Sequence, residues 1–486
     1  MLRQKSDVKR KLDRAHWFSE DLVTDSKKLR PAAEQLLEKL YEYSKPIRKQ
    51  QAKHLPQLEI LILNLLKTSE NKDGLMTLSF SPNSYLGAIS YRVLVEHHIN
   101  TLIRMEWLSL LKGYQSGKDF RRSRVKIEKP LAQWLGRLHI KQSELDRKAP
   151  SRCVTLKDAK KKIITVPELL KPQVEAIEER TTKINLQLEK TFIDLFLDEY
   201  ELEDLNARMS SKAEEDPLNH FQLDLTAKYL RRIFNNESLQ QGGRFYNAWW
   251  QSIPSEYRKL ISLNGDFTVE MDYSSIHIHL LYAQLQQHCP LKDHYVFAKL
   301  KKNFRSVTKT LMMILINAKS EKSAIKAALD QELFSEGYPK GISSPQEYLE
   351  EIYLHHQPIK NYFGSGYGVN LQYKDSEIAE AVMLRMLPSP CLPVHDSFIV
   401  QAGQGARLKR IMNEEFEAAT GVTADIKPKL LTLDQERMRV VRRLIEDELS
   451  SYSSRLNTWW TKHNWKYFTD GGTSLDIPTM VQVHKR

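Results

Sequence analysis

Cysteine is scarce in this chain, and the few cysteines that it has lie far apart. Cys153, Cys289 and Cys391 are the only three, and no two of them form a CxxC pair. This spacing argues against a disulfide framework and against a cysteine-ligated zinc site. The same usage is typical of proteins that work in a reducing compartment, so we expect a cytoplasmic location.

Long apolar runs are missing as well. The most hydrophobic stretch, residues 58–66, is far too short to cross a bilayer, and the opening MLRQKSDVKRKLDR lacks the apolar segment of a signal peptide. We therefore expect neither export nor a membrane partner. Glycine and proline are also few, at 18 and 19, while 41% of the 486 residues are hydrophobic. This composition indicates a globular protein of two or three domains rather than a disordered chain.

Positive charge exceeds negative charge. Lysine and arginine total 73 against 61 for aspartate and glutamate, which gives a formal net charge of +12. Such a balance suits a partner that carries many phosphates, although many soluble proteins share it.

Hydrophobic periodicity divides the chain into five segments. It predicts a helical N-terminal domain over 1–119 and thumb-like amphipathic helices over 173–224. Between them, 120–172 is basic, and VTLKDAKKKIITV predicts a two-stranded hairpin that is either a solvated loop or an arm that grips phosphate. Strands and helices are mixed over 225–430, and 431–486 opens as a helix before an irregular tail.

Within 225–430 the order of elements predicts an α+β fold, with an antiparallel sheet backed by helices. A helix is expected over 224–236, and another over 304–319. The alternation FTVEMDY predicts a strand that ends near Asp272, and LPVHDSFIVQ predicts a strand around Asp396.

These two aspartates carry the first chemical signal. A carboxylate in an apolar strand is costly to desolvate and tends to have a metal ion, a base or a backbone donor as its partner. Taken singly, Asp272 or Asp396 could equally be a turn or cap residue.

The helix between them carries the second signal. Arg305 and Lys309 are four residues apart and share a face with Met313 and Asn317. Phosphoryl transfer needs metal ions held by carboxylates and cations on the departing pyrophosphate, and this order offers a candidate for each. The simpler alternative is an exposed basic face on a surface helix.

These motifs resemble those of the family A nucleotide polymerases, the superfamily of bacterial family A DNA polymerases and phage-type single-subunit RNA polymerases. DYSSIHIH at 272–279 resembles motif A of the DNA enzymes, whereas RSVTK at 305–309 and HDSF at 395–398 resemble motifs B and C of the phage RNA enzymes. GGRFY at 242–246 is similar to the glycine-arginine motif that touches the template. LQYKDSEIAEAV at 371–382 loosely resembles the glutamine-bearing helix before motif C.

The resemblance implies a right-hand core of palm, fingers and thumb, and it assigns roles by position. Asp272 and Asp396 would hold two Mg²⁺ ions, which Mn²⁺ could replace, helped by the Tyr273 carbonyl. Lys309 would also act in catalysis. The residues implied to contact the incoming nucleotide are Arg305, Lys309, Met313, Asn317, His277 and Tyr273. Those implied on the template and primer side are Gly243, Arg244, Gln372 and His395.

Two departures leave sugar selection open. Asn317 and Ala318 stand where the family has Tyr-Gly, and His277 replaces the glutamate that excludes a ribose hydroxyl in the DNA enzymes. We expect a DNA polymerase, in part primase-like, that replicates a phage or other mobile element and works with an accessory single-strand-binding or replication protein. The alternatives are a single-subunit RNA polymerase and a non-catalytic nucleic-acid-binding protein on a polymerase scaffold.

Paired histidines and tryptophans have simpler interpretations. His97 and His98 are expected to be surface or helix-packing residues. Trp249 and Trp250 either fill a core or stack on bases.

Overall fold

The computed structural model of the chain describes residues 15–44, 50–69, 73–82, 85, 89–116, 119–141, 144–150, 152–215, 223–429, 433 and 435–469. The opening stretch 1–14, on which the signal-peptide expectation fell, and residues 470–486 of the expected irregular tail lie outside the described residues.

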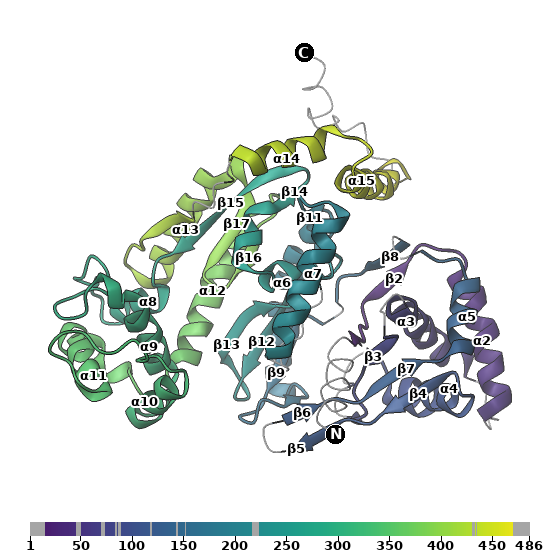
Figure 1. The fold of residues 1–486 in the computed structure, drawn as a ribbon, viewed down its shortest axis with the longest axis horizontal. Coiled ribbons are helices and arrows are strands. Elements are labelled where there is room, and N and C mark those ends of the chain that lie inside the picture. The colour runs from purple at the N-terminus through teal and green to yellow at the C-terminus, as the bar shows by residue number, and fades with distance from the viewer. Residues whose placement is uncertain are drawn as a thin grey trace, which may run out of the picture.

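A six-stranded sheet lies at the centre of the larger part of the molecule (Figure 1). Its order is β11-β14-β15-β17-β16, with β18 also paired to β15, and all of these pairings are antiparallel. The strands are β11 (Ile193–Leu195), β14 (Ile261–Leu263), β15 (Asp266–Tyr273), β16 (Leu392–Val394), β17 (Ser397–Gln401) and β18 (Ile426–Lys429). Together with the helices that cover it, this sheet confirms the predicted α+β class.

Helices pack on this sheet and extend from one end of it. α12 and α13 lie against each other, and α13 also covers β15; α8 to α11 gather at the end drawn on the left of Figure 1. The helices are α6 (Lys171–Glu189), α7 (Glu199–Glu215), α8 (Ile276–Ala283), α9 (Arg305–Asn317), α10 (Glu321–Asp330), α11 (Pro345–His355), α12 (Gly368–Met386), α13 (Gly405–Thr420), α14 (Gln435–Glu446) and α15 (Ser451–Thr469). One continuous hydrophobic core joins them to the sheet.

A second sheet, in the order β10-β9-β12-β13, packs against α12. Its strands are β9 (Val154–Lys157), β10 (Ile163–Ile164), β12 (Arg231–Asn235) and β13 (Ser238–Tyr246). The predicted hairpin of VTLKDAKKKIITV is confirmed as β9 and β10. The helix expected over 224–236 is wrong, because β12 pairs with both β9 and β13 and these distant partners override local preference.

Arg232 joins this second sheet to α12 and is fully buried. Its guanidinium donates to Glu380 at 2.9 Å, to Ser376 at 2.9 Å and to the Gly243 carbonyl at 2.8 Å. Gly243 has φ 80°, and a Cβ there would lie 2.9 Å from the Ser376 hydroxyl, so the close approach of β13 to α12 requires glycine.

The N-terminal region is mixed, so the prediction of a helical domain there is wrong. A four-stranded sheet, β1-β3-β7-β4, stands beside its helices, and the strands are too short for their period to be read. Its elements are β1 (His16–Trp17), α2 (Leu29–Ser44), α3 (Gln51–Ser69), β3 (Leu75–Thr77), the π-helix η2 (Arg92–Ile99), α4 (Asn100–Arg104), β4 (Leu108–Leu111), β7 (Arg124–Ile127) and α5 (Lys129–Arg137). This region has its own hydrophobic core.

The C-terminal segment is more helical than the sequence suggests. α15 continues to Thr469 and is anchored where Arg455 pairs with Asp194 on β11 at 2.9 Å and where the Tyr452 and Ser262 hydroxyls meet at 2.6 Å. In the part of the chain that the structure describes, no helix has both the length and the apolar character that a bilayer span needs.

We predict that Arg232→Met destabilises the fold by about 2–3 kcal/mol, because it removes one of the two charge partners of the buried Glu380 carboxylate, which keeps Arg180 at 2.5 Å. Urea unfolding measures the loss. Arg30→Met is the control, because the Arg30–Glu34 pair is exposed and its loss should leave the midpoint where it is. An Arg232→Met midpoint equal to that of the wild type would contradict the coupling of β12 to α12.

Candidate active site

Strand β15 presents two different faces. Met271 and Tyr273 point into the core, where the Tyr273 ring packs against Phe416 on α13 and its hydroxyl donates to the Met412 carbonyl at 2.6 Å. Side chains alternate along a strand, so Glu270 and Asp272 lie on the opposite face, away from α13. The core thus fixes which way Asp272 points.

Asp396 lies in a tight turn, where a single strand was expected. β16 and β17 form a hairpin in which Val394 pairs with Ser397, and His395 and Asp396 are the turn. His395 is exposed and has φ 57°, a left-handed conformation that is uncommon outside glycine. The prediction of an uninterrupted strand was wrong because neither central residue of this turn is the glycine that such turns usually carry.

The pairing of β15 with β17 brings the two aspartates together. Asp272 pairs with Ser397 in the register, and the Tyr273 amide donates to the Asp396 carbonyl at 3.1 Å. Two acids remote in the sequence therefore lie at the same end of neighbouring strands.

The closeness of the two acids changes the pKa of Asp272. Burial, followed by the charge of Asp396, raises the pKa of Asp272 to about 6. Its Oδ1 atom is buried without a hydrogen-bond partner among the described residues. The ionised form is thus disfavoured in the absence of added positive charge.

Glu270 is a third acid on the same face, and sequence reasoning missed it. Its Oε1 accepts from the Ser397 hydroxyl at 2.5 Å, from Arg258 at 3.0 Å and from Lys429 on β18 at 3.0 Å. The two-residue spacing from Asp272 in VEMDY could have indicated it, because alternate residues of a strand share a face.

Helix α9 supplies cations near these acids. Lys309 is exposed, forms no ion pair within the described part of the chain, and lowers the pKa of Asp272 against the stronger effects of burial and of Asp396. Arg305 is already engaged, since its Nε pairs with Asp293 at 2.8 Å and its guanidinium lies over the Tyr295 ring. The sequence did not reveal Asp293 as its partner.

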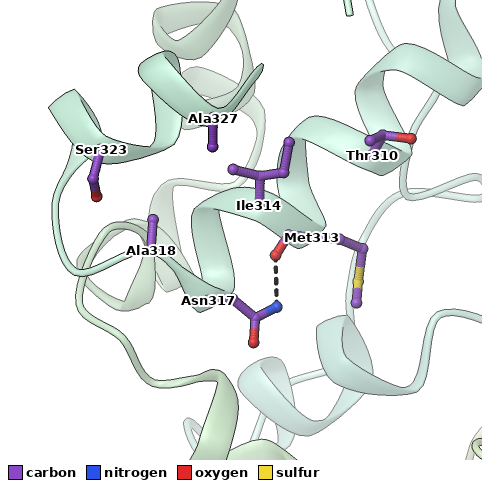
Figure 2. A pocket seen from close by; sticks show the side chains of 7 residues that line it. All are labelled: Thr310, Met313, Ile314, Asn317, Ala318, Ser323 and Ala327. Atoms are coloured by element: carbon purple, nitrogen blue, oxygen red, sulfur yellow. Dashed lines mark hydrogen bonds between the residues drawn. The ribbon is translucent and has the colours of Figure 1, made fainter. Parts of the chain in front are cut away.

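The other end of α9 lines a pocket of about 500 Å³ between α9 and α10 (Figure 2). Figure 2 shows Ile314 of α9 and Ala327 of α10 pointing toward one another, and the Asn317 amide donating to the Met313 carbonyl at 2.8 Å. The lining residues are Thr310, Met313, Ile314, Asn317, Ala318, Ser323 and Ala327. Met313 and Asn317 therefore share one surface of α9, as their spacing predicts.

Arg244, His277 and Asp375 form a compact polar cluster. Arg244 Nε lies 3.0 Å from Asp375 Oδ2, and His277 Nε2 lies 2.9 Å from the same oxygen. Although burial disfavours its charge, hydrogen bonding to Asp375 raises the pKa of Arg244. Arg244 and His277 are thus brought together as partners of Asp375, a residue not singled out in the sequence.

The other template-side candidates are less specific. Gly243 lies inside β13 where the strand approaches α12, and Gln372 is half-buried on α12, one turn before Asp375. Trp249 and Trp250 are both buried, and the Trp250 indole donates to the Pro393 carbonyl at 3.2 Å. Their interpretation as core residues is therefore correct.

The residues at the strand ends fit a divalent cation. Asp272 and Asp396 offer hard oxygen ligands, and the buried Oδ1 of Asp272 lacks a partner within the described ranges. The Tyr273 side chain is held in the core, so only its backbone carbonyl, the group implied by the resemblance, could join them.

No protein-family model matches the chain, and no curated protein matches it in sequence. Among solved structures, the chain is similar to the POL domain of Pol1 from M. smegmatis in complex with a DNA primer-template and dNTP. The TM-score is 0.30 with 11% identity, over 84% of this chain and 66% of that one, so the chain spans less than two thirds of its length. Because a TM-score of 0.30 does not establish a shared fold, function has to be judged from the residues themselves.

We predict that Asp272→Asn stabilises the metal-free protein at pH 8 by about 1–2 kcal/mol, allowing for partial solvent screening. The folded pKa of Asp272, about 6, lies above its ordinary value of 3.8, so the stability it contributes is full below pH 4 and is lost as the pH rises through 6. In thermal unfolding measured from pH 4 to 8, Asp272→Asn should be more stable than the wild type only near pH 8. Mg²⁺ should stabilise the wild type at pH 8 but not the variant.

The matched control is Asp266→Asn at the opposite end of β15, where Asp266 accepts from Gln401 at 2.6 Å. It should retain the wild-type response to Mg²⁺. An Asp272→Asn protein that is less stable than the wild type at pH 8, or equally responsive to Mg²⁺, would contradict the assignment of a cation site.

Proposed function

We propose that this chain is a DNA-templated nucleotidyltransferase that adds nucleotides from nucleoside triphosphates by a two-metal mechanism. The observation that carries the proposal is the convergence of Asp272 and Asp396 on neighbouring strands, with the pKa of Asp272 raised by burial and by Asp396. Such an arrangement is electrostatically costly and is common at functional sites.

The acids have separate tasks in this proposal. Asp272 and Asp396 would hold two Mg²⁺ ions, which when bound polarise phosphoryl oxygens and neutralise charge on the attacking and leaving oxygens. Glu270 is neutralised by Arg258 and Lys429, so it orients the Ser397 hydroxyl on the neighbouring strand instead of serving as a primary ligand.

The cations of α9 would hold the triphosphate. Lys309 is exposed, and its charge lowers the pKa of Asp272, though less than that of Lys429 does; this supports a role for Lys309 in binding phosphate oxygens and in donating a proton to the departing pyrophosphate. Arg305 would exchange Asp293 for a phosphate, because it can bind either anion through its guanidinium. Met313 and Asn317 would continue this surface toward the nucleotide.

The polar cluster around Asp375 would serve the template and primer side. Asp375 fixes the orientation of the Arg244 guanidinium and of the His277 ring, so both would be preorganised beside the strand end. His395 lies in the turn between β16 and β17. Together with Gln372 and Gly243, to which the resemblance gives the same role, it would contact the template and primer. Replication of a mobile element and an accessory single-strand-binding protein stay predictions.

We predict that the wild type extends a primed DNA template with Mg²⁺ or Mn²⁺, and that Asp272→Asn and Asp396→Asn each lower the rate at least ~10³-fold. Parallel reactions with dNTPs and rNTPs, each with and without a primer, distinguish DNA polymerase, RNA polymerase and primase activity. Asp266→Asn should extend at the wild-type rate. No incorporation of either nucleotide pool would remove the enzyme proposal; salt-sensitive DNA binding that both variants retain would then indicate the non-catalytic alternative.

We predict that Lys309→Ala lowers kcat at least ~100-fold while the Kd for primer-template changes less than about threefold, because Lys309 acts on the triphosphate. Steady-state kinetics and fluorescence anisotropy measure the two quantities. Lys322→Ala, an exposed lysine at the start of α10, is the control for general basic charge and should change neither by much. Equal losses in kcat and DNA affinity would show that Lys309 only contributes to a basic surface.

A further inference from the structure

Three histidines converge in the N-terminal region, in a hydrophobic core separate from the one beneath Asp272. His54 lies on α3, and His97 and His98 lie at the end of the π-helix η2. Their ring centroids are 4.5 to 5.2 Å apart, and one nitrogen from each lies within 4.8 Å of the others. His97 and His98 were expected only to pack or to face solvent.

The hydrogen bonds around the cluster leave a nitrogen lone pair of His98 directed toward His97. His98 Nε2 lies 3.2 Å from the His54 carbonyl, which can only accept, so His98 in its neutral form carries its proton on Nε2 and a lone pair on Nδ1. That Nδ1 lies 3.3 Å from Nδ1 of His97, whose Nε2 is 3.0 Å from the Ser44 hydroxyl. His54 Nδ1 is buried and has no hydrogen-bond partner among the described residues.

The spacing of one pair of these nitrogens matches tetrahedral metal coordination. Zinc–nitrogen bonds of about 2.0–2.1 Å at a tetrahedral angle place two ligand nitrogens ~3.3–3.4 Å apart. The distance of 3.3 Å between the Nδ1 atoms of His97 and His98 falls on this value. Ser44 and the His54 carbonyl hold the outer nitrogens, as partners of metal-bound imidazoles commonly do.

The surroundings hold the rings in place. The Tyr41 ring packs edge-on against His54 and His97 at 5.6 and 5.5 Å. Imidazole rings held in a fixed orientation favour metal binding.

We propose that His54, His97 and His98 form a transition-metal site, for Zn²⁺ in the first place, that ties α3 to η2. Imidazole favours Zn²⁺, Cu²⁺ or Ni²⁺ over Mg²⁺, which prefers oxygen ligands, so this site is chemically distinct from the one at Asp272 and Asp396. Three protein ligands leave a fourth position for water. The metal stabilises the packing of the N-terminal region and takes no part in nucleotide addition.

Zinc titration of the full chain in Mg²⁺-free buffer, followed by calorimetry and by metal analysis after dialysis, tests the proposal. The wild type should bind about one equivalent, and a large excess of Mg²⁺ should not displace it. His98→Asn and His54→Asn should each bind at least ~100-fold more weakly. His139→Asn is the matched control, because His139 is exposed, lies outside the cluster and has φ 48°, which asparagine tolerates.

Two further readouts keep the test decisive. Zn²⁺ should raise the thermal midpoint of the wild type and of His139→Asn but not that of His98→Asn. Co²⁺ in the wild type should give the intense visible bands of a tetrahedral site, a measurement that does not depend on whether any variant folds. A wild type without saturable zinc binding, a six-coordinate Co²⁺ spectrum, or a folded His98→Asn protein with unchanged affinity would each overturn the proposal.

Discussion

The antiparallel pairing of β15 with β17 is the constraint on which the candidate active site depends. Its register sets Asp272 opposite Ser397, and the turn before Ser397 delivers Asp396. Because side chains alternate, a slip of one residue would exchange Asp272 for Met271 on the face that points away from α13. The Tyr273 ring against Phe416 and its hydroxyl bond to Met412 resist that slip, so burial on one face of the strand fixes chemistry on the other.

The surrounding charges divide into those that are satisfied and those that are not. Glu270 has three donors, and Asp375 has Arg244 and His277, so these buried acids are neutralised within the chain. One oxygen of Glu270 and one of Asp272 are buried without a hydrogen-bond partner within the described ranges, but only Asp272 also lacks an ion pair there and shares its end of the sheet with a second acid, Asp396. Local imbalance of this kind identifies the place where a cation would bind. The three-histidine cluster offers uncharged imidazole nitrogens instead of carboxylate oxygens. A softer metal than Mg²⁺ is therefore expected there.

The sequence predicted the parts of the fold that have a clear period or an unambiguous turn. The helix from Arg305, the strand FTVEMDY and the hairpin of VTLKDAKKKIITV were all recovered. The strand β12 and the short strands near the N-terminus were not, because partners distant in the chain decide them. For the site, the order of the motifs indicated both aspartates and Lys309, but Asp375 and Asp293 are known only from their contacts, and the meeting of His54 with His97 and His98 requires the packing of α3 on η2.

Iron-mediated cleavage of the protein backbone is the most direct test of whether Asp272 and Asp396 converge on a shared metal site. Fe²⁺ that replaces Mg²⁺ generates radicals only within a short range of the bound ion, so the fragments report which segments surround it. We predict paired cleavage near residues 272 and 396, suppressed by Mg²⁺ and lost in Asp396→Asn, whereas any cleavage near the histidine cluster should persist in Mg²⁺. Cleavage at only one of these two segments, or at neither, would contradict the convergence of the two aspartates on a shared metal site.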